Sequence, residues 1–295
     1  MIRNFLKKDG ASPFRAAVFL SGTGTNAARI LERRMRKKSS PWEPVAVVTD
    51  RPASAAADLA RRFSLPLVEH DIAAFYRDRG MDRVSLAGTD GMRIRGLWTD
   101  ALRTMLEPYR IDFGIFAGFV PLTNIVSDFP CLNVHPGDLL VEENGRRVLT
   151  GLHSVPVEAA LKRGLPYLRS SVLVLSAFDP AVKNVDGGFL LGVSAPVPVE
   201  WSDAMRREIA DAAAAREGRA RSQFRDDALS RFAGTYLERL KVNGDWIVFP
   251  QTVDDFAAQR FSCDDASGAV YYDGVRVRAV EYRSGHEPRR ITENE

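Results

Sequence analysis

Short apolar runs alternate with amphipathic stretches along the first half of the chain, and this alternation constrains the fold more than any other feature. The runs typical of strands lie at 15–20, 44–49, 65–69, 111–117 and 131–134. The stretches typical of helices lie at 27–38, 53–63 and 91–106. Strands that alternate with helices at this spacing predict an α/β fold with a doubly wound, mostly parallel sheet. Because ligands of such sheets bind outside the carboxyl ends of the strands, we expect the site in the turns at that edge.

The second half of the chain predicts further strands and helices. Strands are expected at 170–175, 188–199, 246–249 and 269–280, and helices at 151–163, 202–216 and 223–241. Asp273-Gly274 is typical of a tight hairpin turn. We expect an N-terminal extension at 1–14, a catalytic domain at 15–200, and a small C-terminal helix and β-hairpin extension at 201–295 that packs on the same domain.

Composition excludes several classes of function. The chain has 295 residues, of which 45% are hydrophobic, and this is enough to bury a full core. With 41 basic and 38 acidic residues, its net charge of +3 is too small to predict a nucleic-acid partner. The cysteines are Cys131 and Cys263, which favours a reducing compartment over a disulfide scaffold. Since no apolar run approaches the ~18 residues of a membrane span and the N-terminus carries no secretory signal, we expect a cytoplasmic protein without membrane contacts.

The run at 131–134 leads into residues that suit acyl transfer. Asn133 and His135 are two apart, so on a strand both side chains leave the same face. An amide can hold a developing oxyanion and an imidazole can move a proton, and acyl transfer needs both groups. Taken alone, so short a motif favours a strand end and a structural histidine.

A glycine-rich turn, residues 21–26 (SGTGTN), joins the first strand to the first helix. It would present backbone N–H groups at a helix N-terminus, which is a site for an anion. Side chains of the turn could donate as well, and Arg93 or Arg95 could close over the anion. The turn is neither the G-x-G-x-x-G of dinucleotide sites nor a P-loop. By itself it is equally compatible with a simple tight turn.

Three other segments carry expectations of their own. Asp186-Gly187-Gly188 allows a strained turn that could aim the carboxylate inward. The polar stretch 141–150 is expected to be a surface insertion. His70 is expected at the surface, and His153 is expected to act as a local helix cap.

Taken in order, these motifs resemble a known family. The glycine turn, Ala117-Gly118-Phe119, Asn133-Val134-His135-Pro136, Gly151-Leu152-His153 and Asp186-Gly187-Gly188 resemble the tetrahydrofolate-dependent formyltransferases, most closely those of purine synthesis that act on phosphoribosylglycinamide. The resemblance covers about residues 15–198 well and the tail loosely. It implies a Rossmann-type formyltransferase fold, 10-formyltetrahydrofolate as co-substrate, small-molecule substrates, and a monomer or homodimer without a metal.

The resemblance also implies roles for single residues. Asn133 would bind the formyl oxygen, protonated His135 would stabilise the oxyanion, and Asp186 would fix the imidazole and relay protons, with His135 and Asp186 both at a solvent-facing edge. The acceptor phosphate would be bound by Gly22, Thr23, Gly24, Thr25, Asn26 and Arg93. The folate would be bound by Gly118, Phe119, Val120 and Val185.

The chain departs from the family pattern around these residues. Gly137-Asp138 replaces the usual Ser-Leu after His135-Pro136, and Pro121 stands where an arginine is common. The glycine turn favours a phosphorylated acceptor, so glycinamide ribonucleotide is the first to consider, and the departures make another amine, such as an amino-sugar nucleotide, the alternative. A hydrolase is a weaker alternative. A non-catalytic folate or nucleotide binder is also weaker, because a binder needs no proton relay.

Overall fold

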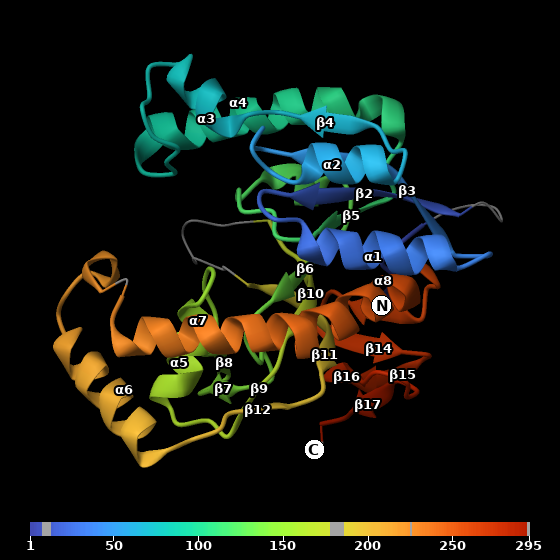
Figure 1. The fold of residues 1–295 in the computed structure, drawn as a ribbon. Coiled ribbons are helices and arrows are strands. Elements are labelled where there is room, and N and C mark those ends of the chain that lie inside the picture. Colours follow the sequence, from blue (N-terminus) through green and yellow to red (C-terminus); the bar gives the residue numbers. More distant parts are fainter. Residues whose placement is uncertain (8–12, 178–185, 225, 294–295) are drawn as a thin grey trace.

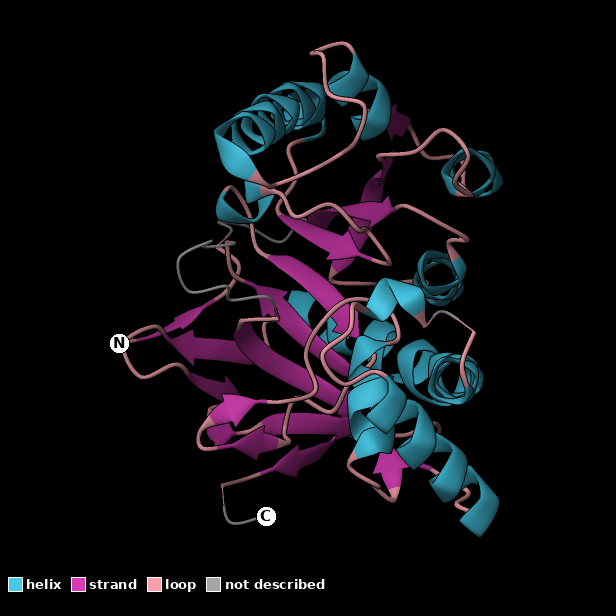
Figure 2. Ribbon diagram, turned by 90° about the vertical axis from the view of Figure 1, so that its left-hand side faces the viewer, coloured by secondary structure: helices cyan, strands magenta, loops and turns pink. Residues whose placement is uncertain are grey.

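A nine-stranded sheet forms the centre of the molecule, within the residues that the computed structural model describes (1–7, 13–177, 186–224 and 226–293). Its strand order is β17-β16-β11-β10-β6-β5-β2-β3-β4 (Figure 1). The strands are β2 (Phe14–Leu20), β3 (Trp42–Thr49), β4 (Leu67–Glu69), β5 (Phe113–Phe116), β6 (Cys131–His135), β10 (Ser171–Leu175), β11 (Gly188–Ser194), β16 (Ala279–Tyr282) and β17 (Arg289–Ile291). Their twist relative to one another is visible in Figure 2.

The strand directions make this sheet mostly parallel, as predicted. β4, β3, β2, β5 and β6 form a run in which each strand is parallel to the next, and β11 is parallel to β16. β10 is antiparallel to β6 and β11, and β17 is antiparallel to β16. The register pairs Leu20 with Thr49 and Phe116 with Asn133. The segments that follow β2, β3 and β5 therefore leave the sheet at the carboxyl edge where β6 ends.

Helices cover both faces of the parallel half of the sheet. The helices are α1 (Thr25–Arg36), α2 (Ala56–Arg62), α3 (Ile72–Arg77), α4 (Gly88–Leu106), α5 (Val155–Lys162), α6 (Asp203–Ala215), α7 (Ala228–Leu240) and α8 (Trp246–Ala257). Successive side chains of β2 point to opposite faces. Val18 and Leu20 pack with α1, α2 and α8, whereas Ala17 and Phe19 pack with α3 and α4. This is the doubly wound arrangement that the alternation of strands and helices predicted.

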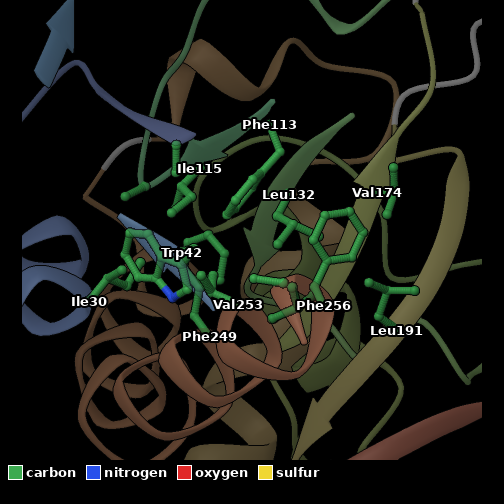
Figure 3. Packing of buried hydrophobic residues seen from close by; sticks show 14 of the residues in the cluster. Ile30, Trp42, Phe113, Ile115, Leu132, Val174, Leu191, Phe249, Val253 and Phe256 are labelled. Carbon is green, nitrogen blue, oxygen red and sulfur yellow. The ribbon is translucent and has the colours of Figure 1, made fainter. Parts of the chain in front are cut away.

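Aromatic side chains fill the core beneath α1 and α8 (Figure 3). Trp42, Phe249 and Phe256 are each no more than 1% exposed. Trp42 Nε1 donates to Asp254 Oδ1 over 3.1 Å, and Arg33 Nε and Lys37 Nζ each lie 2.7 Å from Asp254 Oδ2. Asp254 therefore ties α8 to both α1 and β3.

The C-terminal part contributes to the central sheet and also forms a second one. The second sheet has the order β1-β13-β14-β15. Its strands are β1 (Ile2–Asn4), β13 (Phe261–Asp264), β14 (Ala269–Tyr272) and β15 (Val275–Val277). Asp273 and Gly274 form the predicted hairpin turn, with φ angles of 49° and 77°. The predicted N-terminal extension includes β1, which pairs antiparallel with β13 of the C-terminal part.

The strand expected at 246–249 is wrong. α7, a five-residue π-helical turn, η4 (Lys241–Asp245), and α8 follow one another directly, and Pro250 lies inside α8. The bulky residues of 246–249 favour a strand locally. Tertiary packing overrides this local preference. In helical form, Val248 and Phe249 are buried between α8 and the sheet.

The remaining elements are short. They are the 3₁₀ helices η1 (Glu107–Tyr109), η2 (Asn124–Ser127) and η3 (Arg221–Gln223), and the strand pairs β7 (Glu142–Glu143) with β8 (Arg146–Arg147) and β9 (Tyr167–Leu168) with β12 (Val197–Pro198). α5, α6 and α7 pack on one another around a separate apolar cluster. No helix of the described residues is long and apolar enough to cross a membrane.

Candidate active site

Asn133 and His135 end the central strand β6, as the sequence predicts. His135 is 2% exposed, and both of its ring nitrogens have partners. Nδ1 lies 3.3 Å from Asp186 Oδ1, and Nε2 lies 2.7 Å from the carbonyl oxygen of Leu149. Since the carbonyl can only accept, Nε2 carries a proton, and a second proton on Nδ1 would be donated to the carboxylate. A carboxylate oxygen and a carbonyl oxygen therefore face the two ring nitrogens of His135.

Asp186 is held in a strained turn just before β11. Its φ of 58° lies in the left-handed region, and Gly188 follows with a φ of 112°. The backbone N–H of Gly151 donates to Asp186 Oδ2 over 2.7 Å, and Arg147 Nη1 donates to the Asp186 carbonyl over 2.9 Å. Gly151 thus holds the carboxylate and Arg147 holds the backbone of Asp186, while Oδ1 faces His135. The pair lies together as predicted, and the catalytic roles of its members stay a prediction.

The expectation of a solvent-facing position for this pair is wrong. The side chain of Asp186 is 8% exposed and that of His135 is 2% exposed. The cause is the segment expected to be a surface insertion at 141–150. Its tip, the β7–β8 hairpin, is exposed, but its base supplies the Leu149 carbonyl and the Arg147 guanidinium to the site.

Gly137 lies in close contact with the imidazole of His135 and with the segment that covers it. A Cβ at this position would lie 2.8 Å from His135 Nε2 and 2.8 Å from Pro156 Cβ, and it would also collide with the Leu149 carbonyl. A glycine is needed here because the 141–150 segment packs directly against the imidazole. Gly137 and the 141–150 segment are therefore coupled by their packing at the imidazole.

A cavity of about 90 Å³ opens beside the pair. Asn133 and Asp186 line it together with Phe119 and Val120, two of the residues predicted to bind folate. Phe119 also packs in the core, against Phe19 and Phe116. Gly118 is exposed, has a φ of 86°, and accepts a hydrogen bond from the Ser21 N–H. Val185 lies outside the described residues.

The glycine turn reaches the same edge and begins α1. Gly24 is the N-cap with a φ of 65°, and no side chain of the described residues caps the helix. Leu59 and Leu20 would collide with a Cβ at Gly24, whereas a Cβ at Gly22 would meet open space. Thr23 is exposed, and Thr25 and Asn26 are half-buried. The first N–H groups of α1 therefore point from an uncapped helix end, which favours negative charge.

Asp245 is a candidate site residue that the sequence reasoning missed. It ends the π-helical turn η4, and its carboxylate accepts hydrogen bonds from Ser170 Oγ and from Asn26 Nδ2, the latter over 3.0 Å. Burial raises the pKa of Asp245, while the Ser170 and Asn26 hydrogen bonds and the charges of Lys241 and His135 lower it. The signal in the sequence was Asn243-Gly244-Asp245, a turn-like tripeptide inside a helical region, since π-helical turns are frequent at functional sites.

These contacts revise the side-chain roles expected at the turn. The Asn26 amide donates to Asp245, and its Oδ1 is buried without a hydrogen-bond partner among the described residues. Arg93 is 62% exposed on α4 and lies 3.5 Å from Asp90. Arg95 is buried and donates to the carbonyl of Leu122. Since α4 packs on the opposite face of the sheet from α1, the structure does not bring Arg93 together with the turn.

The other two histidines named in the sequence also have defined surroundings. His153 is exposed with a φ of 55°, and α5 begins after it at Val155, with Ser154 as its N-cap. His70 is half-buried, so the surface position expected for it is wrong. Its ring stacks on Trp98 with centroids 5.3 Å apart, and burial lowers its pKa. In the described part of the chain, no group of three or more His, Cys, Asp or Glu side chains could hold a metal ion.

The fold is that of a formyltransferase. Among solved structures, the chain is similar to the phosphoribosylglycinamide formyltransferase from Coxiella burnetii, with a TM-score of 0.59, 18% identity, and 90% of this chain and 96% of that chain covered. It is also similar to the phosphoribosylglycinamide formyltransferase from Anaplasma phagocytophilum (TM-score 0.56, 17% identity, 92% and 99% covered). A third is glycinamide ribonucleotide transformylase 1 from Symbiobacterium toebii (TM-score 0.53, 22% identity, 92% and 93% covered). No protein-family model and no curated protein matches the chain.

Proposed function

We propose that this protein transfers the formyl group of 10-formyltetrahydrofolate to the amine of a small phosphorylated acceptor, with glycinamide ribonucleotide as the first candidate. The observation that carries this proposal is the buried His135–Asp186 pair beside Asn133, where the Asp186 carboxylate and the Asn133 amide line one cavity. The likeness of the fold to solved formyltransferases supports the reaction class.

The reaction follows from these groups. The acceptor nitrogen attacks the formyl carbon, and the new C–N bond forms as the carbonyl oxygen becomes an oxyanion. Asn133 donates a hydrogen bond to that oxygen, and the positive charge of His135 stabilises it. Asp186 takes the proton that the amine loses. The bond from the formyl carbon to the folate nitrogen then breaks, and that nitrogen gains a proton, so the relay ends with Asp186 free of the extra proton.

The acceptor side rests on the glycine turn and on Asp245. The uncapped end of α1 offers backbone N–H groups to a phosphate, and Gly22 leaves open space for its approach. Asn26 Oδ1 is buried and needs a hydrogen-bond donor, and the Asp245 carboxylate is bound to the same side chain. Both groups suit a sugar hydroxyl, so a phosphate and a sugar would be bound by adjacent parts of one site.

A substrate panel tests the proposal. The change in folate absorbance on loss of the formyl group would be followed with glycinamide ribonucleotide, with the same compound lacking its phosphate, and with an amino-sugar nucleotide. We expect turnover with the first and a markedly higher KM for the second. Equal KM values for these two would remove the phosphate site, and turnover only with the amino-sugar nucleotide would establish the alternative acceptor. Formyl transfer to none of them, together with failure to bind tetrahydrofolate, would refute the proposed function.

A further inference from the structure

A second cavity, of about 180 Å³, adjoins the Asp186 turn (residues 186–188). Its walls come from three distant parts of the chain, which are the segment 139–147, the start of β11, and the C-terminal strands β14 and β15. Arg147 and Gly188 belong to these walls, and the Arg147 guanidinium also holds the backbone of Asp186. Because the volume is below the ~300–1,000 Å³ of drug-sized ligand sites, the cavity suits a small ligand.

Two half-buried arginines line this cavity, and neither forms an ion pair with a carboxylate of the described residues. Arg147 Nη1 and Nη2 donate to the carbonyls of Asp186 and Gly188 over 2.9 and 3.2 Å. Arg278 Nη2 donates to the carbonyl of Leu140 over 2.9 Å. Since a guanidinium has five N–H donors, most of the donors of both side chains remain for a ligand. The nitrogens that bond nothing in the described chain are not buried, so a ligand in the cavity has access to them.

The other charged groups of the cavity leave Arg147 without full compensation. Arg276 Nη2 and Glu293 Oε1 pair with each other over 2.6 Å, and both side chains are exposed. Burial lowers the pKa of Arg147, and the charge of the exposed Glu142 raises it only in part. A guanidinium that is partly removed from water and lacks a carboxylate partner favours an anion.

The surroundings of Arg278 leave the same opening. The charge of Arg278 lowers the pKa of the Asp138 carboxyl, although burial raises that pKa more strongly. Asp138 Oδ2 lies 3.8 Å from Arg169 Nε, so its charge is shared with a second arginine. Arg278 is thus a second cation at this cavity that an anion would neutralise.

We propose that this cavity binds a small dianion, a phosphate or a dicarboxylate, and that the anion held by Arg147 and Arg278 fixes the Asp186 turn. Both ligands share the chemistry that matters, because the planar fork of a guanidinium matches phosphate and carboxylate oxygens equally. The site is separate from the cavity at Asn133 and from the glycine turn, so it goes beyond the proposed function.

The coupling to the candidate active site runs through the segment that covers His135. Arg278 holds this segment at the Leu140 carbonyl, and Arg147 joins it to the backbone of Asp186. The same segment supplies the Leu149 carbonyl to His135. An anion that bridges the two arginines therefore fastens the covering segment and the Asp186 turn to each other. A ligand that binds the folded form in this way also raises stability.

Calorimetry with inorganic phosphate and with succinate, without substrates and at constant ionic strength, tests the site. In Arg278→Gln we expect the affinity to fall by about tenfold or more, because the charge is lost while glutamine still offers a donor to the Leu140 carbonyl. Arg146→Gln is the matched control. It removes the same charge beside Arg147, but consecutive residues of a strand point to opposite faces, and Arg146 does not line the cavity.

The control variant should change the affinity by less than about twofold, because salt screens a charge outside the site. Any binding of these anions at the glycine turn is common to both variants and cancels in the comparison. Tighter binding of phosphate than of succinate would assign a phosphate ligand, and the reverse would assign a dicarboxylate. Equal affinities in Arg278→Gln and Arg146→Gln, or no saturable binding of either anion, would overturn the proposal.

Turnover and melting test the coupling to Asp186. At about 100 times Kd, the anion should raise Tm by about 4–8 °C and should raise kcat at saturating substrates. An anion that competes only at the glycine turn would raise the KM of the acceptor and leave kcat unchanged. Both increases should be absent in Arg278→Gln and present in Arg146→Gln, and an unchanged kcat in the unmodified protein would overturn the coupling. Because binding and melting need no turnover, failure of formyl transfer would refute the proposed function without removing the anion site.

Discussion

Gly137→Ala is the substitution that most directly probes the buried histidine. The added Cβ would lie 2.8 Å from both His135 Nε2 and Pro156 Cβ, whereas ordinary carbon contacts need about 3.5–4.0 Å. The chain must therefore move by about 1 Å. A shift of this size would lengthen the 2.7 Å contact between His135 Nε2 and the Leu149 carbonyl beyond hydrogen-bonding distance.

The expected loss combines two terms. Overpacking costs about 1–3 kcal/mol, and leaving the buried Leu149 carbonyl without its hydrogen bond costs about 1–3 kcal/mol. Because the shift relieves part of the overlap, we expect a total of roughly 2–4 kcal/mol in the free energy of unfolding, measured by urea denaturation. Formyl transfer should fall by about tenfold or more, since a misplaced imidazole no longer faces Asp186 in the required geometry.

A matched glycine controls for the general effect of adding a methyl group. Gly234 is exposed in the middle of α7, and a Cβ there meets nothing within 4 Å. Gly234→Ala should raise stability by about 0.5–1 kcal/mol through helix propensity and leave formyl transfer unchanged. If Gly137→Ala behaves like Gly234→Ala, the contact between the 141–150 segment and His135 does not position the imidazole.

Three other perturbations have defined outcomes. His135→Ala or Asp186→Ala should lower formyl transfer by about 10² or more, with His286→Ala as an exposed control, and near-normal turnover would remove the pair from the mechanism. His135→Ala should also reduce stability, because it leaves the Leu149 carbonyl buried and unpaired. The Arg216 hydrogen bond lowers the pKa of Asp227 from 3.8 to about 2, so the stabilisation is present above pH 3.8 and is lost as the pH falls toward 2. Melting curves of Asp227→Asn should therefore differ from those of the unmodified protein at neutral pH and converge with them near pH ~2, and a difference that does not depend on pH would contradict this linkage. Phe256→Ala should cost about 3–5 kcal/mol of unfolding free energy, because the ring is 1% exposed in the core, and a cost below about 1 kcal/mol would show that this packing is misassigned.

The fold and the main candidate residues could be predicted because their signals are local. The strands at 15–20, 44–49 and 131–134 are apolar runs bounded by turns, and a parallel sheet brings their carboxyl ends to one edge whatever the loops do. That geometry is sufficient to place the glycine turn, Asn133 and the 118–121 turn near one another. The turn at Asp186 was also predictable, because two glycines after an aspartate permit the strained backbone that aims the carboxylate.

Tertiary structure decided which segments close the site, since long-range packing leaves little trace in a local pattern. The 141–150 segment reads as polar and therefore as surface, yet its backbone carbonyl at Leu149 bonds His135, and a carbonyl has no side-chain signature. The apolar residues at 246–249 favour a strand locally, but they form part of α8 because this helix packs on the sheet. Asp245 and Arg147 are charged residues like many others in the sequence. They are distinct only because folding places one beside Asn26 and the other between the Asp186 turn and a cavity, where a guanidinium without a carboxylate partner favours an anion.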